Sequence, residues 1–282
     1  MADLPDRVRL VIFDLDGVIY RGTEAVAGAP ELVAWLHDRG VPVRFATNNS
    51  MVTRDAYVER LGAMGIATDV EEIVTSTSAT VDHLAQHAPD VRSVLAIGAD
   101  GMRRELETAG LEVTRAADVR PAMPGGPLER QFDAVIVGLD LTVDYDALAS
   151  AMAAVADGAR LIATNADRRY PTPGGFLPGA GAIVAALATA TGATPEVIGK
   201  PEPGMFRYTI ESCGVPASEC VVVGDNPEAD VAGAHRAGCA SILVLTGVAT
   251  ASVAAALAGE RRPDAVAADP SEVRRLLEGR VS

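Results

Sequence analysis

The 282-residue sequence is poor in several features that would point to a particular class of protein. Its three cysteines, Cys213, Cys220 and Cys239, are odd in number and match no zinc or redox spacing, so we expect buried thiols rather than disulfides. No apolar run reaches the roughly 18 residues that a membrane span requires. The first ten residues contain no apolar segment of a secretory signal. These absences favour a cytoplasmic protein that does not bind a membrane.

Positive charge is also scarce. Lysine and arginine number 24 against 38 aspartates and glutamates, which gives a net charge of -14. A surface this acidic repels a polyphosphate backbone, so we do not expect nucleic-acid binding. Any phosphate site must therefore be built locally, from a metal ion, a lone cation or a helix N-terminus.

Lysine is almost absent, because Lys200 is the only lysine among the 24 basic residues. Arginine substitutes well for lysine on a surface, but poorly where a compact ammonium must lie against another charged group. Lys200 is therefore a candidate functional residue. The alternative is that one lysine was retained by chance.

Short β-branched runs alternate with longer amphipathic stretches, which predicts an α/β fold with a doubly wound parallel sheet. A small polar stretch at Thr75–Ser78 and a Pro/Gly-rich stretch at Pro171–Pro178 indicate boundaries. We predict a Rossmann-like core formed by residues 1–78 and 179–282, with a second α/β domain inserted at residues 79–178.

Polar residues follow four strands that we assign to the core sheet. The predicted strands and the residues after them are Val8–Phe13 before Asp14 and Asp16, Val41–Ala46 before Thr47 and Asn48, Val197–Gly199 before Lys200, and Val221–Val223 before Asp225, with Asp230 a little further on. The carboxyl ends of parallel strands share one edge of a sheet, so we expect these side chains to meet there.

The residue types predict the chemistry of this edge. Clustered carboxylates require a counter-charge, and their hard oxygens select Mg²⁺. Asp14 is suited to attack phosphorus, and Asp16 to protonate the leaving group and then deprotonate water. Thr47 and the Asn48 amide can hold phosphoryl oxygens, which Lys200 can neutralise.

The segments DLDGVIY, TNNS, GKPEP and GDNPEAD resemble, in order, the four motifs of the haloacid dehalogenase (HAD) superfamily. The pair Asp14 and Asp16 is similar to the DxD of its phosphatase branch. The inserted domain resembles a C2-type cap, and ATNADRRYPTPGGFLPGAGAIVAAL resembles the NagD / p-nitrophenyl phosphatase / phosphoglycolate phosphatase subfamily.

This resemblance implies a role for each matching residue. Asp14 would be the nucleophile and a Mg²⁺ ligand, and Asp16 the general acid/base and a ligand through its main-chain carbonyl. Asp225 would be the third protein ligand, while Asp230 would support the ligands without binding the ion. The residues that would face the phosphate or the substrate are Thr47, Asn48, Asn49, Lys200, Asn165, Asp167, Tyr170 and Asn226. Asp167 could instead cap a turn, and Asn226 a helix.

The expected activity is hydrolysis of small phosphate monoesters through an aspartyl-phosphate. Some relatives carry His where this chain has Tyr170, so their substrate preference is not transferred. Relatives of this type are often dimers joined through the cap, which makes a homodimer a further expectation. The rival hypothesis is a phospho-receiver or other phosphate-binding module, which would need neither the inserted domain nor Asp16.

Overall fold

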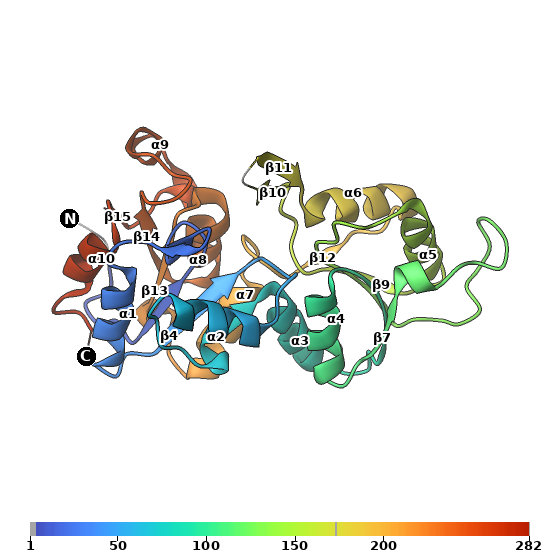
Figure 1. Ribbon diagram of the computed structural model, residues 1–282, viewed down its shortest axis with the longest axis horizontal. Helices are drawn as coiled ribbons and strands as arrows, with labels where there is room; N and C mark the ends of the chain where they lie inside the picture. Colours follow the sequence, from blue (N-terminus) through green and yellow to red (C-terminus); the bar gives the residue numbers. More distant parts are fainter. Residues whose placement is uncertain (1–3, 173, 282) are drawn as a thin grey trace. The chain divides into compact units, whose positions relative to one another are not determined.

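A computed structural model describes residues 4–172 and 174–281, which form two compact units (Figure 1). One unit consists of the chain up to Thr47, Arg54–Val74 and the chain from Lys200 onward. The other consists of Asn48–Thr53 and Thr75–Gly199. The two ends of the chain, blue and red in Figure 1, thus fold together.

The first unit is built on a six-stranded sheet. In order across the sheet, its strands are β15 (Ala265–Ala267), β14 (Ala240–Val244), β13 (Cys220–Gly224), β1 (Leu10–Phe13), β4 (Val43–Thr47) and β5 (Ile73–Thr75). Every residue of β1 and β13 is buried, as expected for parallel strands covered by helices on both faces. The chain runs outward from β1 through β4 and β5, and on the other side from β13 through β14 and β15. The strand order therefore reverses between β1 and β13, the place where such sheets bind ligands.

Helices of this unit pack against the sheet and against one another. They are α1 (Ala29–His37), α2 (Arg54–Ala63), α7 (Gly204–Cys213), α8 (Ala232–Ala237), α9 (Ala251–Ala255) and α10 (Pro270–Leu277). α1 contacts α10, and α7 contacts α8. A short ribbon of β2 (Tyr20–Arg21) and β3 (Glu24–Ala25) follows β1.

The second unit has its own five-stranded parallel sheet. Its strands in order are β12 (Glu196–Val197), β9 (Arg160–Ala163), β8 (Ala134–Val137), β6 (Ser93–Ile97) and β7 (Glu112–Arg115). The helices are α3 (Ser76–His87), α4 (Asp100–Thr108), α5 (Tyr145–Ala156) and α6 (Ala180–Thr191). An antiparallel ribbon of β10 (Arg169–Thr172) and β11 (Gly175–Pro178) completes it.

The α/β class with parallel sheets is confirmed, but two details of the sequence prediction are corrected. The predicted boundary after Pro178 assigned α6 to the core, whereas Ile183, Val184 and Leu187 of α6 pack in the apolar cluster of the second unit. The strand before Lys200 was assigned to the core sheet, whereas β12 pairs with β9.

The two stretches predicted as boundaries also have regular structure. Thr75 is the N-cap of α3, and its hydroxyl accepts a hydrogen bond from the Ser78 amide. The Pro/Gly-rich stretch forms the β10–β11 ribbon, with Pro173 outside the described residues. Among the described residues, no helix combines the length and the apolar character needed to cross a membrane.

Candidate active site

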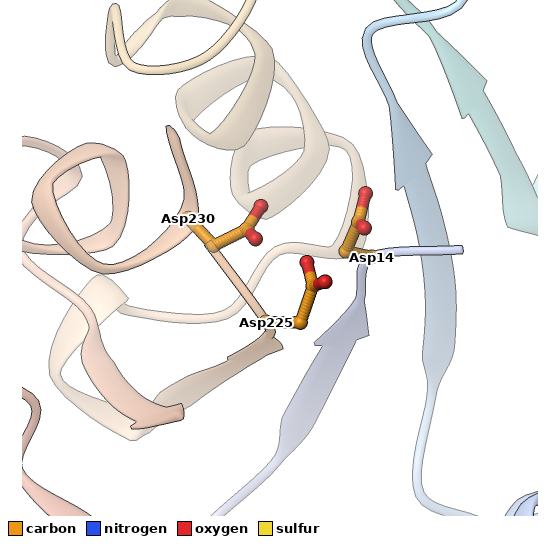
Figure 2. A group of neighbouring side chains, drawn as sticks. All are labelled: Asp14, Asp225 and Asp230. Carbon is orange, nitrogen blue, oxygen red and sulfur yellow. The ribbon is translucent and has the colours of Figure 1, made fainter. Parts of the chain in front are cut away.

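Two acidic residues lie where the strand order reverses. Asp14 follows β1 and Asp225 follows β13, and the Asp14 amide donates to the Val223 carbonyl at 2.9 Å. Figure 2 shows that both carboxylates, together with that of Asp230, point into one small space. One ligand atom from each of the three lies within 4.8 Å of the others. Strands far apart in the sequence thus bring their terminal carboxylates together, as the parallel arrangement predicted.

Lys200 links this cluster internally. Its Nζ donates to Asp14 Oδ1 at 2.6 Å, to Asp230 Oδ1 at 2.7 Å and to the Ala46 carbonyl at 3.1 Å. Only 3% of the Lys200 side chain is exposed. Three acceptors around one ammonium match its three protons, a geometry that the planar guanidinium of arginine does not provide. This explains why an otherwise lysine-free chain has a lysine here.

Asp230 and Asp225 are each fixed by a main-chain amide. Asp230 lies in the irregular helical turn Pro227–Val231, and its Oδ2 accepts from the Asn226 amide at 3.0 Å. Asp225 Oδ2 accepts from the Val248 amide at 2.7 Å. Both oxygens of Asp230 therefore have protein donors, and its supporting role stays a prediction.

The donor set fits a divalent cation with oxygen ligands. When ionised, three carboxylates beside one ammonium leave an excess of two negative charges in a largely buried space, which a divalent cation would balance. Hard oxygen donors with this charge are typical of Mg²⁺ sites. Gly17 and Gly247 lie so close to Asp225 that a Cβ at either position would collide with its carboxylate. Backbone thus surrounds the Asp225 side chain closely and limits its movement.

Burial and like charge raise the pKa values of Asp14 and Asp225. Burial is the main cause of the raised pKa of Asp14, with Lys200 opposing it and Asp230 and Asp225 adding to it. Burial and Asp230 raise the pKa of Asp225 to about 6. Burial would lower the pKa of Lys200, but Asp14 and Asp230 raise it above its usual value, so the ammonium stays charged. Without a metal ion, the carboxyl groups of Asp14 and Asp225 therefore resist ionisation.

Asp16 lies beside the cluster, in the turn that follows β1. Its side chain is exposed, whereas Tyr20 is fully buried and donates from its hydroxyl to Asp16 Oδ2 at 3.2 Å. Partial loss of hydration next to the protein raises the pKa of Asp16, while the charge of Arg60 and the Tyr20 hydrogen bond lower it. A carboxyl with a raised pKa that solvent can reach is suited to exchange protons with a substrate.

Thr47 is the last residue of β4, and its side chain is buried. The adjacent strands β13, β1 and β4 therefore deliver Asp225, Asp14 and Thr47 to one edge. Asn226 uses its Oδ1 to accept from the amides of Glu228 and Ala229, so it caps the turn as the alternative interpretation expected. Its contact with substrate stays a prediction.

The other predicted substrate residues lie in the second unit. Asn48 Nδ2 donates to both carboxylate oxygens of Asp167, at 3.1 and 3.2 Å, and Asn165 Nδ2 donates to the Asn48 carbonyl at 2.8 Å. These three residues form one hydrogen-bonded group. Asn49 Oδ1 accepts from the Met51 amide at 2.8 Å. Tyr170 is a half-buried residue of β10.

Sequence reasoning missed the loop after β14. Thr246 donates from Oγ1 to the Gly17 carbonyl at 2.6 Å, and Val248 holds Asp225 as described. Because β14 is parallel to β13, Thr246 and Gly247, which follow β14, lie at the same sheet edge as Asp225, and this pair of residues was the available signal. Tyr20 was also missed, because nothing in its local pattern shows that the turn closes onto Asp16.

Comparison with known proteins gives consistent matches along most of the chain. Residues 11–112 match the model of the haloacid dehalogenase-like hydrolases, and residues 197–273 match a model described as HAD-hydrolase-like. An acid sugar phosphatase of Staphylococcus aureus is 37% identical over 239 residues, covering 85% of this chain and 87% of that protein. A 5'-nucleotidase of Bacillus subtilis is 38% identical, covering 84% and 87%.

Solved structures agree with these matches. A glycerol phosphate phosphatase of Mycobacterium tuberculosis in complex with magnesium is 32% identical with a TM-score of 0.84, covering 95% of this chain and 77% of that one. A 4-nitrophenylphosphatase of Thermotoga maritima is 30% identical with a TM-score of 0.85, covering 96% and 97%. The similarity therefore extends over both units.

Proposed function

This chain belongs to the haloacid dehalogenase-like hydrolases, and from that premise we propose that it is a Mg²⁺-dependent phosphatase. Its substrates are small phosphate monoesters, and Asp14 carries the phosphoryl group as a covalent aspartyl-phosphate. The observation that carries the proposal is the bridging of Asp14 and Asp230 by Lys200, with the Asp225 carboxylate in the same cluster. The relatives named above are all phosphatases or nucleotidases by name but differ in substrate, which supports phosphate-ester hydrolysis and leaves the leaving group open.

Three groups of this chain would hold the metal ion: the carboxylates of Asp14 and Asp225 and the main-chain carbonyl of Asp16. When bound there, Mg²⁺ supplies positive charge that offsets the repulsion between the carboxylates and an anionic substrate. Asp230 keeps Lys200 and the loop of Asp225 in place.

The chain's own residues then perform two transfers. A carboxylate oxygen of Asp14 forms a bond to phosphorus as the bond to the leaving oxygen breaks, and Asp16 gives that oxygen its proton, releasing an alcohol. Water next attacks the same phosphorus while Asp16 takes up a proton of that water. The bond from phosphorus to Asp14 breaks, and free phosphate and the Asp14 carboxylate result. Lys200 and Thr47 stabilise the charge on the phosphoryl oxygens.

We assign the second unit the role of a cap that selects the leaving group, with the cluster of Asn48, Asn165 and Asp167 among its recognition residues. A phospho-receiver is not favoured, because phosphatases match the chain over both units. Asp16 is a second reason. We assign its side chain to proton transfer and not to metal binding, and a receiver without turnover needs no such group.

The test is a panel of monoesters assayed with Mg²⁺ and with chelator. The wild-type chain should hydrolyse glycerol phosphate, a sugar phosphate, a 5'-nucleotide or 4-nitrophenyl phosphate only with Mg²⁺, and Asp14→Asn should be inactive on all four. Acid quenching during turnover should leave one phosphoryl group on the peptide that contains Asp14. Asp38→Asn, an exposed residue at the end of α1, is the matched control and should keep full activity. Activity of Asp14→Asn above background in pure protein would show that another group is the nucleophile.

A further inference from the structure

We propose that Tyr20 and Arg60 are positioning residues that fix which oxygen of Asp16 exchanges a proton with the leaving group. Through this role they decide how well the enzyme cleaves esters of poor leaving groups. The inference rests on the phosphatase function proposed above. It gives a role to two residues for which the sequence analysis predicted none.

The turn after β1 places Tyr20 against Asp16. The amides of Ile19 and Tyr20 both donate to the Leu15 carbonyl, at 2.9 and 3.2 Å, and the Gly17 amide donates to the Tyr20 carbonyl at 2.8 Å. Gly17 has a φ of 83°, a left-handed conformation that favours glycine. The main chain thus closes on itself between Asp16 and Tyr20, and the phenol has little freedom to move away.

Arg60 contacts both the Tyr20 ring and the turn that follows it. The guanidinium of this α2 residue lies 3.9 Å from the centre of the Tyr20 ring, and its Nη2 donates to the Gly22 carbonyl at 2.5 Å. A cation over an aromatic face combined with a charge-assisted hydrogen bond clamps the β2–β3 ribbon to α2. A fully buried ring therefore anchors a carboxylate that solvent can reach.

This arrangement distinguishes the two oxygens of Asp16. Oδ2 accepts the phenolic hydrogen of Tyr20, so the proton that Asp16 transfers resides on Oδ1. The same bond restrains rotation of the carboxyl group. An alkoxide is too strong a base to leave unprotonated, whereas 4-nitrophenolate is stable as an anion. Misplacing the acid therefore slows the alkyl ester far more than the aryl ester.

The test compares glycerol phosphate with 4-nitrophenyl phosphate in Tyr20→Phe, which keeps the ring under Arg60 and removes only the hydroxyl. We expect kcat/KM to fall about tenfold or more for glycerol phosphate and by less than about threefold for the aryl ester. The control is Tyr145→Phe, the same change at an exposed tyrosine at the start of α5, in which the ratio between the two esters should not change. Equal losses on both esters in Tyr20→Phe would overturn the inference.

A double-variant cycle identifies the route of the effect. If Tyr20 acts through Asp16, Tyr20→Phe combined with Asp16→Asn should be no slower on glycerol phosphate than Asp16→Asn alone. Multiplied losses would mean an independent effect and would refute the positioning role. Mg²⁺ should raise the melting temperature of Tyr20→Phe by as much as it raises that of the wild type. This result would show that the fold and metal binding are intact in the variant.

Arg60→Gln provides a second variant that leaves Tyr20 in place. It should shift the ratio between the two esters in the same direction, by a smaller factor, and an unchanged ratio counts against the clamp. A wild-type chain that cleaves neither ester would remove the phosphatase proposal and this inference together. A wild-type chain that cleaves both, with no selective loss in the variants, would remove only this inference.

Discussion

Replacing Asp225 with Asn should stabilise the metal-free protein while abolishing its activity. The Asp225 carboxylate is buried, 5% exposed, and faces Asp230 and Asp14. Burial and Asp230 raise its pKa from the ordinary 3.8 to about 6. Asparagine keeps the shape and can accept the Val248 hydrogen bond through its own oxygen, but it has no charge to desolvate.

The size of the effect follows from this pKa. A rise from 3.8 to about 6 corresponds to about 3 kcal/mol, since a tenfold change in proton affinity equals about 1.4 kcal/mol. Protons redistribute among the coupled carboxylates, so we expect about 1 to 3 kcal/mol in the free energy of unfolding. Asp225 binds its proton more tightly in the folded chain than in the unfolded one. The wild type therefore loses stability relative to Asp225→Asn as the pH rises from about 4 to about 6, and the difference is complete at pH 7.

The assay is urea unfolding in chelator, followed by fluorescence of Trp35, the single tryptophan, which lies in α1 of the same unit. Unfolding is measured at several pH values between 5 and 7.5, and then with Mg²⁺. The wild type should gain stability on Mg²⁺ addition and Asp225→Asn should gain little. A variant that is less stable than the wild type at pH 7.5 without metal, by an amount independent of pH, would refute the view that the cluster repels itself.

Two more substitutions probe the same site. Lys200→Met should lower kcat at least about 100-fold and destabilise the fold by about 3 to 5 kcal/mol in urea unfolding, because it leaves two buried carboxylates unpaired; equal stability to wild type at pH 7 would contradict this. Gly247→Ala should weaken Mg²⁺ binding about 10- to 100-fold in calorimetric titration, because its Cβ collides with the Asp225 carboxylate. Gly62→Ala, where a Cβ meets open space, is the matched control, and equal Mg²⁺ affinity in the two variants would show that the close approach is unimportant.

Local pattern was sufficient for the parts of this protein that depend on hydrophobic periodicity. The segments of β1, β4 and β13 are short, mainly apolar runs, which is the pattern typical of buried parallel strands. Once they are parallel, their carboxyl ends share an edge, so the meeting of Asp14, Thr47 and Asp225 followed from sequence. Lys200 stood out in the sequence because it is the only lysine among 24 basic residues, and an arginine suits a buried charged contact poorly.

The contacts that complete the site were decided in three dimensions. β12 has two residues, too few for a sequence pattern to show which sheet it joins. Its pairing depends on the hydrogen-bonding edge of β9, which only the folded structure reveals. Likewise, the hydrogen bonds of Tyr20 to Asp16 and of Val248 to Asp225 depend on how loops close over the sheet edge. Periodicity is a property of neighbouring residues, whereas loop closure depends on residues far apart in the chain. The sequence alone therefore determined the fold class and the acidic edge, and only the tertiary structure decided which groups orient those acids.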